Sequence, residues 1–194
     1  MTEPPRRRPG GRSARVRDAV IAATLDELLE HGLAELTLGR VAARAGVAET
    51  TIYRRWGSRT ALIADALTGL AAAGNPPPDT GSVREDLRLL AEQVRDLIAA
   101  PAITRLLTTV AALAADPELA AARRAFWDHR FEQTRPIVER ARAAGLLRAE
   151  ADPRVVVESL VAPLYFRVLV TGEALGDDIV TRCVDDTLRR YGTA

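Results

Sequence analysis

The stretch TLGRVAARAGVAETTIYRRWGSR, residues 37–59, has the pattern of two short helices joined by a tight turn at residues 45–47. Apolar residues recur at helical spacing in both halves, so each helix has one apolar stripe. Gly46 stands where the first helix must stop, because glycine tolerates the left-handed conformation used there. The stretch therefore predicts a helix-turn-helix unit.

A two-helix unit of this size cannot bury a core by itself. The preceding segment, residues 13–30, supplies a third helix whose apolar residues fall on one face. These residues are Val16, Val20, Ala23, Leu25, Leu28 and Leu29. We expect the three helices to form a small head.

The polar face of the second helix of the unit suits a DNA major groove. Thr50 and Thr51 offer short hydroxyls and methyls to base edges. Arg54 or Arg55 suits guanine or phosphate, because the guanidinium fork fits both. Tyr53 is expected to donate to a phosphate oxygen, which positions the helix without reading sequence.

Positive residues flank this face on both sides. Ser58 is the expected N-cap of the next helix, where exposed N–H groups and Arg59 would clamp a phosphate. Residues 1–12, MTEPPRRRPGGR, have the composition of a disordered arm. With Arg12 and Arg15 the arm would follow the minor groove or backbone; the alternative is a solvated tail that does nothing specific.

The string LLEHGLAELTLGRVAARAGVAETTIYRRWGSRTALIADAL, residues 28–67, resembles the DNA-binding domain of tetracycline-repressor (TetR) family regulators. The resemblance places Gly39 where many members carry a basic residue, so Arg40 is the expected substitute. It also implies a set of DNA-contacting positions. They are Thr37, Glu49, Thr50, Thr51, Tyr53, Arg54, Arg55 and Arg59.

Composition and charge indicate the fold class. The 194 residues are 47% apolar, largely alanine and leucine, and only 4% aromatic, which favours helices without a sheet. Residues 1–60 hold 11 arginines and 7 acidic residues, net +4, whereas residues 61–194 are net −3. We therefore expect an all-α protein of about nine helices, with a DNA-facing head on a larger helical bundle body.

The stretch GNPPPDTGS, residues 74–82, is the clearest break in the chain, since consecutive prolines cannot continue a helix. We assign 1–12 to the arm, 13–60 to the head, and 61–194 to an effector-binding and dimerisation domain. Pro136 and Pro163 fall inside helical stretches and should kink them. The expected helices after the head are 58–73, 82–99, 101–115, 117–144, 153–171 and 177–190.

The resemblance implies a homodimer, in which the last two helices pair with their symmetry mates as a four-helix bundle. A head of this size also needs a two-fold partner to reach a second half-site. The alternative is that the same residues pack only inside one chain. The candidates are Val156, Leu160, Leu164, Val168, Val180, Val184, Leu188 and Tyr191.

An effector pocket is expected within the body, although the same side chains would equally serve as core. Arg167 interrupts the apolar run LYFRVLV and requires a partner. That partner is a carboxylate from another helix, from a dimer mate, or from an anionic effector. The candidate lining is Leu107, Val110, Phe126, Trp127, Phe131, Tyr165 and Arg167.

Other classes of protein fit the sequence less well. The nucleophile-elbow, Walker, dinucleotide and zinc-protease motifs are absent, so we expect no enzyme, cofactor or metal. Cys183 is the only cysteine, which fits the cytoplasm, and no run is apolar enough to span a membrane. A non-specific DNA-organising protein is the second rival, but the basic residues concentrate at one end.

The sequence thus predicts a ligand-responsive transcription regulator, expected to be a repressor. A small-molecule effector would release it from a palindromic double-stranded DNA operator.

Overall fold

The computed structural model describes residues 11–112 and 117–193. Within these ranges the chain forms nine α-helices and one π-helical turn, without a β-strand. The all-α prediction is therefore confirmed. Nearly all of the predicted basic arm, residues 1–10, lies outside the described residues.

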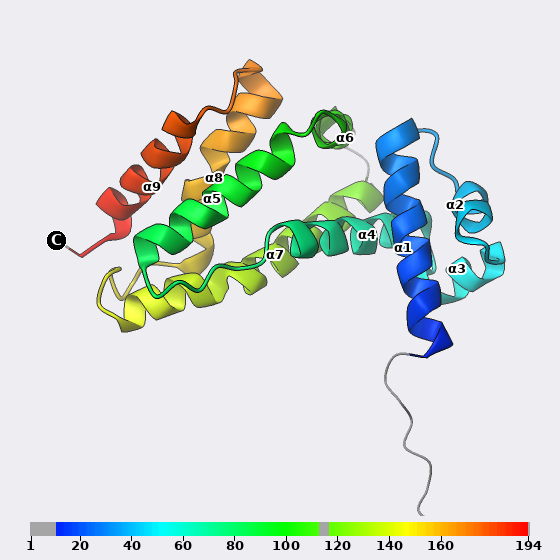
Figure 1. Cartoon of the computed structure of the whole chain (residues 1–194), viewed down its shortest axis with the longest axis horizontal. Helices are drawn as coiled ribbons and strands as arrows, with labels where there is room; N and C mark the ends of the chain where they lie inside the picture. Colours follow the sequence, from blue (N-terminus) through cyan, green and yellow to red (C-terminus); the bar gives the residue numbers. More distant parts are fainter. Residues whose placement is uncertain (1–10, 113–116, 194) are drawn as a thin grey trace, which may run out of the picture.

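The head comprises α1 (Arg12–His31), α2 (Leu38–Ala45) and α3 (Glu49–Trp56), at the right of Figure 1. Gly46 ends α2 at φ 67°, in the left-handed conformation that the turn requires. Helix α1 packs against α2, and α3 packs against α2 and α4, so the predicted third helix completes the core. That core contains Val20, Ala23, Leu28, Leu33, Leu36, Leu38, Val41, Ala42, Ile52, Leu62, Ile63 and Leu106.

Helix α4 (Arg59–Gly74) leads out of the head and lies along α7 (Pro117–Ala143) in the body (Figure 1). It begins where the sequence predicts, because the Ser58 hydroxyl accepts a hydrogen bond from the Ala61 N–H at 3.1 Å. The same helix contacts α1 on the head side. Helix α4 is thus shared between the two parts of the molecule.

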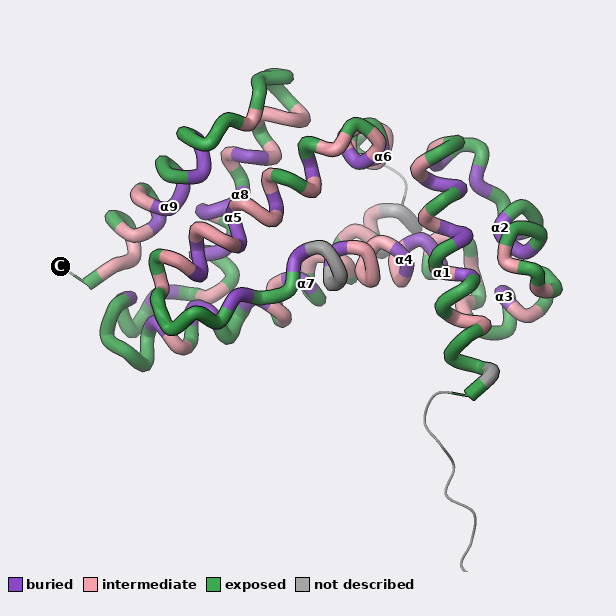
Figure 2. Tube along the Cα trace, viewed as in Figure 1, coloured by how far each residue is buried: buried purple, intermediate pink, exposed green. Residues whose placement is uncertain are grey.

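The remaining helices of the body are α5 (Val83–Ala99), α6 (Pro101–Ala112), α8 (Pro153–Phe166) and α9 (Asp177–Tyr191). Three of the body helices begin with the proline expected there, namely Pro101, Pro117 and Pro153. Figure 2 shows the buried faces of α5, α8 and α9 turned toward one another. They enclose the core of the body.

Two prolines lie inside body helices. Helix α7 continues through Pro136, so this residue does not split it. Helix α8 passes three residues after Pro163 into the π-helical turn η1 (Arg167–Thr171), which Gly172 ends at φ 68°. The end of α8 therefore departs from regular α-helical geometry.

Candidate nucleic-acid interface and ligand cavity

Helix α3 presents a polar face to solvent over an apolar underside. Ile52 is fully buried in the head core, whereas Tyr53 is 54% exposed. The other outward side chains are the predicted ones: Glu49, Thr50, Arg54 and Arg55 are exposed, and Thr51 is half-buried. The face proposed to read DNA is therefore available on the surface.

The amino-terminal end of α3 carries a negative charge. Ala48 supplies no side-chain cap, and Glu49 is the acidic residue of the first turn, where a carboxylate stabilises the helix dipole. A Cβ on Gly39 would lie 3.5 Å from the Glu49 Oε2. A side chain at position 39 would thus lie beside Glu49; with glycine there, the exposed Glu49 carboxylate has no such neighbour.

Thr37 and Arg40 belong to the first turn of α2. The Thr37 hydroxyl accepts from the Arg40 N–H at 3.2 Å, so it caps the helix while its own hydrogen stays available to a phosphate. The Arg40 side chain turns back to α1, where its Nε lies 2.7 Å from the Glu27 carboxylate. Its guanidinium therefore has a structural role that the sequence reading missed.

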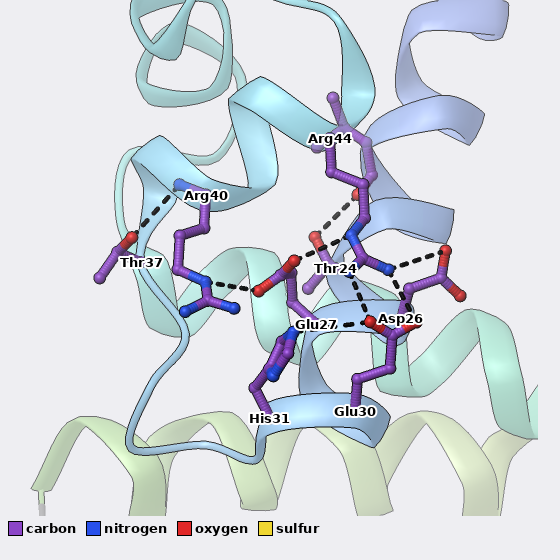
Figure 3. A network of polar contacts seen from close by, with 9 residues as sticks. Thr24, Asp26, Glu27, Glu30, His31, Thr37, Arg40 and Arg44 are labelled. Carbon is purple, nitrogen blue, oxygen red and sulfur yellow. Dashed lines mark hydrogen bonds and ion pairs between the residues drawn. The ribbon is translucent and has the colours of Figure 1, made fainter.

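Glu27 joins α1 to α2 through two arginines (Figure 3). Glu27 is only 4% exposed. The Nε of Arg44 lies 2.8 Å from the second carboxylate oxygen of Glu27. Arg44 also pairs with Glu30 at 2.5 Å. Burial alone would raise the pKa of Glu27, but the Arg40 hydrogen bond and the charges of Arg40 and Arg44 outweigh it and lower that pKa.

Two further predicted DNA contacts are partly engaged by the protein. Arg55 donates to the Ser13 carbonyl at 3.2 Å and to its hydroxyl at 3.1 Å. Arg59 donates to the Leu33 carbonyl in the loop before α2. Both arginines therefore fasten the reading unit to neighbouring segments of the head.

The other basic candidates differ in what surrounds them. Arg54 forms no ion pair or hydrogen bond through its side chain with the described residues, and it borders a hollow between α1 and α3. Arg15 is exposed on the first turn of α1. The side chain of Arg12 lies outside the described residues. Arg54 is therefore the arginine of α3 most available to a ligand.

A cavity of about 220 Å³ lies between α4, α5, α6, α7 and the end of α8. Its wall is apolar except for Arg123 and the Tyr165 hydroxyl. Trp127 contacts both Phe126 and Tyr165 edge to face, at centroid distances of 5.3 and 5.4 Å. Five of the residues predicted to line a pocket do so: Leu107, Val110, Phe126, Trp127 and Tyr165.

Two predicted pocket residues do not line this cavity. Phe131 stacks on Trp127 at 5.8 Å and borders the neighbouring hollows instead. Arg167 turns away to the loop after η1, where its Nη1 donates to the Ala174 carbonyl at 3.2 Å and its Nε lies 3.4 Å from Glu173. The partner that Arg167 requires is thus a carboxylate six positions later in the same chain.

The cavity wall and the core of the head share residues. Ile63 and Leu106 are buried members of the head core, and Leu67 and Val110 pack against it. All four also line the cavity. The cavity therefore borders directly on the packing of the head.

The predicted dimer residues need correction. Val156, Leu160, Leu164, Val180 and Val184 are 0–2% exposed within the single chain, where they belong to the core formed by α5, α7, α8 and α9. Val168, Leu188 and Tyr191 are half-buried against the same core. The most apolar stripes of α8 and α9 face inward, because these side chains form the core of the body.

A different face of α8 and η1 is apolar and open. Val155 is 40% exposed, Phe166 55% and Val170 67%. The spacing of 11 and then 4 residues places them on one side of a helix. This stripe is a further candidate contact with a second copy, beside the half-buried Val168, Leu188 and Tyr191.

Chemistry-bearing groups are few in the described part of the chain. It brings together no set of three or more histidine, cysteine, aspartate or glutamate side chains able to hold a metal ion. Cys183 is a buried free thiol, and burial raises its pKa. No helix in residues 11–112 and 117–193 has both the length and the apolar character of a membrane span.

Two family models together match most of the chain. Residues 20–66 match that of bacterial regulatory proteins of the tetR family, and residues 77–187 match that of the tetracyclin repressor-like C-terminal domain. The first model covers α2, α3, the part of α1 from residue 20 onward and the first half of α4. The second covers most of the body.

Named relatives and solved structures agree with the family models. The chain is 35% identical to the HTH-type transcriptional regulator AqdR of Rhodococcus erythropolis, over 88% of this chain and 80% of the relative. It is 31% identical to a DNA-binding transcriptional repressor TetR of Mycobacteroides abscessus, over 88% and 90%. A crystal structure of a TetR-family transcription regulator matches 90% of this chain and 97% of its own, with 33% identity and a TM-score of 0.80. The exposed reading helix, the shared helix α4 and these relatives lead to one conclusion: the chain belongs to the TetR family of DNA-binding transcription regulators, and is not an enzyme.

Proposed function

We propose that this regulator is a homodimeric repressor that binds a palindromic operator and leaves it when a small molecule enters the α4–α7 cavity. The observation that carries the DNA-binding part is the polar, solvent-facing side of α3 above buried Ile52. In a dimer, two such helices would enter successive major grooves about 34–36 Å apart. The compartment implied is the one that holds the DNA, the cytoplasm.

Each outward side chain of α3 has a distinct proposed task. Thr50, Thr51 and Arg54 contact base edges, and Glu49 accepts from an exposed cytosine amino group. Tyr53 donates to phosphate, as does Thr37 at the start of α2, which positions the reading helix. Arg55 already donates to Ser13 through one nitrogen, and its remaining N–H donors are proposed to bind phosphate.

Support for the dimer comes from the open apolar side of α8 and η1. Phe166 at 55% exposure and Val170 at 67% are large apolar side chains left in contact with water. Exposed apolar patches of this kind mark protein contacts. A two-fold axis beside α8 would cover the stripe with its own copy.

The switch is proposed to run through the shared residues of cavity and head. A ligand in the cavity would press on Ile63 and Leu67 of α4 and on Leu106 and Val110 of α6, all of which touch the head core. Energetically, the ligand must prefer the arrangement that binds DNA poorly. The distance between the two heads is the quantity that changes.

Selection of bound sites from random duplex DNA tests the operator. We expect a short palindrome, and on it Arg54→Ala should cost about 1–3 kcal/mol and relax specificity at one position. Tyr53→Ala should weaken binding to all sequences alike. Arg189→Ala on α9, an exposed arginine far from the head, should leave affinity unchanged.

Two results would contradict the assignment. Unchanged gel-shift affinity for both α3 variants would exclude α3 as the reader. Selection that returns no common sequence, with affinity governed by salt alone, would favour a non-specific DNA-organising protein.

A further inference from the structure

Arg130 of α7 is a buried cation without a carboxylate partner in the described part of the chain. It is 6% exposed, and the ion pairs found in the described residues leave it out. Its guanidinium donates to the Gln133 Oε1 at 2.7 Å and, from both Nη atoms, to the Asn75 carbonyl at 3.3 Å. Burying such a charge without an opposite charge is costly, so its presence requires a reason.

The surroundings of Arg130 connect it to the cavity. A small hollow of about 30 Å³ is lined by Arg130, Asn75 and Thr134, and it shares Trp127 and Tyr165 with the large cavity. Ala71, Leu97 and Phe126 also border both spaces. A hollow of this size has room for about one water-sized group, so it would take the head group of a ligand whose body fills the cavity.

The chemistry of this end of the cavity selects for an anion. Burial lowers the pKa of Arg130, and it raises the pKa of Tyr165 to about 12, so the phenol stays neutral and is no counter-ion. Arginine has five N–H donors, and the three contacts above use only the Nη atoms. The planar guanidinium suits a carboxylate better than any neutral acceptor.

We propose that the ligand of the α4–α7 cavity is an amphipathic organic anion, whose apolar body lies against Phe126, Trp127 and Tyr165 and whose acid group pairs with Arg130. This inference rests on the proposed function of the cavity and names the class of its ligand. The acid group competes with the Asn75 carbonyl for the N–H donors of Arg130, and Asn75 is the C-cap residue directly after α4. Ligand charge thereby acts on the helix that joins body to head.

A matched series of eight-carbon probes tests the inference: octanoate, 1-octanol and octylammonium. Binding is followed by the fluorescence of Trp127 in the Trp56→Phe background, because the chain has two tryptophans and only Trp127 lines the cavity. Calorimetry on the unmodified chain checks the same affinities. We expect octanoate to bind about tenfold or more tighter than 1-octanol, and octylammonium not to bind.

Variants locate the charge that makes the difference. Arg130→Gln should bring octanoate affinity down to that of 1-octanol without changing 1-octanol, and Arg130→Lys should keep part of the preference. Arg123→Gln is the matched control, because Arg123 is an arginine of α7 that lines the large cavity, whereas Arg130 lines the small hollow beside it; Arg123→Gln should change the octanoate preference less than Arg130→Gln. If Arg130→Gln does not fold, the comparison of Arg130→Lys with the unmodified chain decides.

The outcomes separate the two proposals. Equal or better binding of 1-octanol by the unmodified chain, or loss of the preference in Arg123→Gln alone, overturns the anion inference and leaves the cavity as a ligand site. Failure of all three probes to bind overturns the ligand cavity itself, and the inference with it.

Discussion

Glu27 shows how one buried carboxylate organises the head. It holds Arg40 at 2.7 Å and Arg44 at 2.8 Å, both from α2, so it sets the position of α2 on α1. Without the Glu27 carboxylate, both arginines would lose this counter-charge. We therefore expect Glu27 to act on DNA binding through the geometry of the helix-turn-helix.

We expect Glu27→Gln to lower the thermal unfolding midpoint at neutral pH. Because the pKa of Glu27 in the folded protein is lowered from its ordinary value of 4.5, the stabilisation is complete above that value and is lost as pH falls through the folded pKa. The difference in midpoint between the two proteins should therefore shrink as pH falls from neutral to about 3. Differential scanning calorimetry across this range measures it.

Asp26→Asn provides the control, since Asp26 is exposed and lies 3.7 Å from Arg44. It should shift the midpoint much less, because exposed ion pairs contribute little. Equal shifts for the two variants, or a difference that grows toward acid pH, would contradict the role given to Glu27.

Helix α8 illustrates what decides orientation at the level of an element. Leu160 and Leu164 are fully buried in the body, while Val155 and Phe166 on another side are open to solvent. Helix α8 is thus apolar on two faces: one forms the core of the body, and the other is open to solvent. The open face, with η1, is the candidate contact between two copies.

Phe166→Glu should convert the dimer into a monomer. The two glutamates would repel each other across the two-fold contact, and the contact would lose the apolar burial of Phe166. The fold should keep its stability within about 0.5 kcal/mol, because the side chain is at the surface. Sedimentation velocity at several protein concentrations measures the mass. Leu146→Glu, at a side chain 50% exposed outside α8 and η1, should leave the mass unchanged; a dimer that persists in Phe166→Glu would exclude this face.

At the scale of the whole molecule, head and body are joined by shared packing. Helix α4 contacts both α1 and α7, and α6 reaches the head through Leu106 and Val110. Linkage requires that DNA weaken ligand binding by the same factor by which ligand weakens DNA binding. The shared residues should set the size of that factor.

Val110→Ala should reduce this coupling. The change removes contacts between cavity and head core, so the ratio of octanoate affinities with and without the selected operator should move toward one. Val83→Ala is the matched control, because Val83 packs on the body core outside the cavity. Equal ratios in Val110→Ala and the unmodified chain would exclude α6 as a route of coupling.

Local signals made much of this molecule predictable. Gly46 ends α2, Ser58 begins α4, and Pro101, Pro117 and Pro153 open body helices, because caps and breakers act within a few residues of themselves. The outward face of α3 also follows from its own periodicity. Part of the cavity lining was foreseen, since aromatic residues cluster on α7.

Sequence alone thus determined the all-helical fold, the helix-turn-helix and the family, all of which depend on short-range patterns. Only the tertiary structure decided that Arg40 turns to Glu27 and that Arg167 turns to Glu173 instead of the cavity. It also decided that Arg130 is buried beside the cavity, and which apolar side of α8 faces the core. The physical reason is the same in each case: a side chain's partner depends on which distant helices meet, and helical spacing does not encode that meeting.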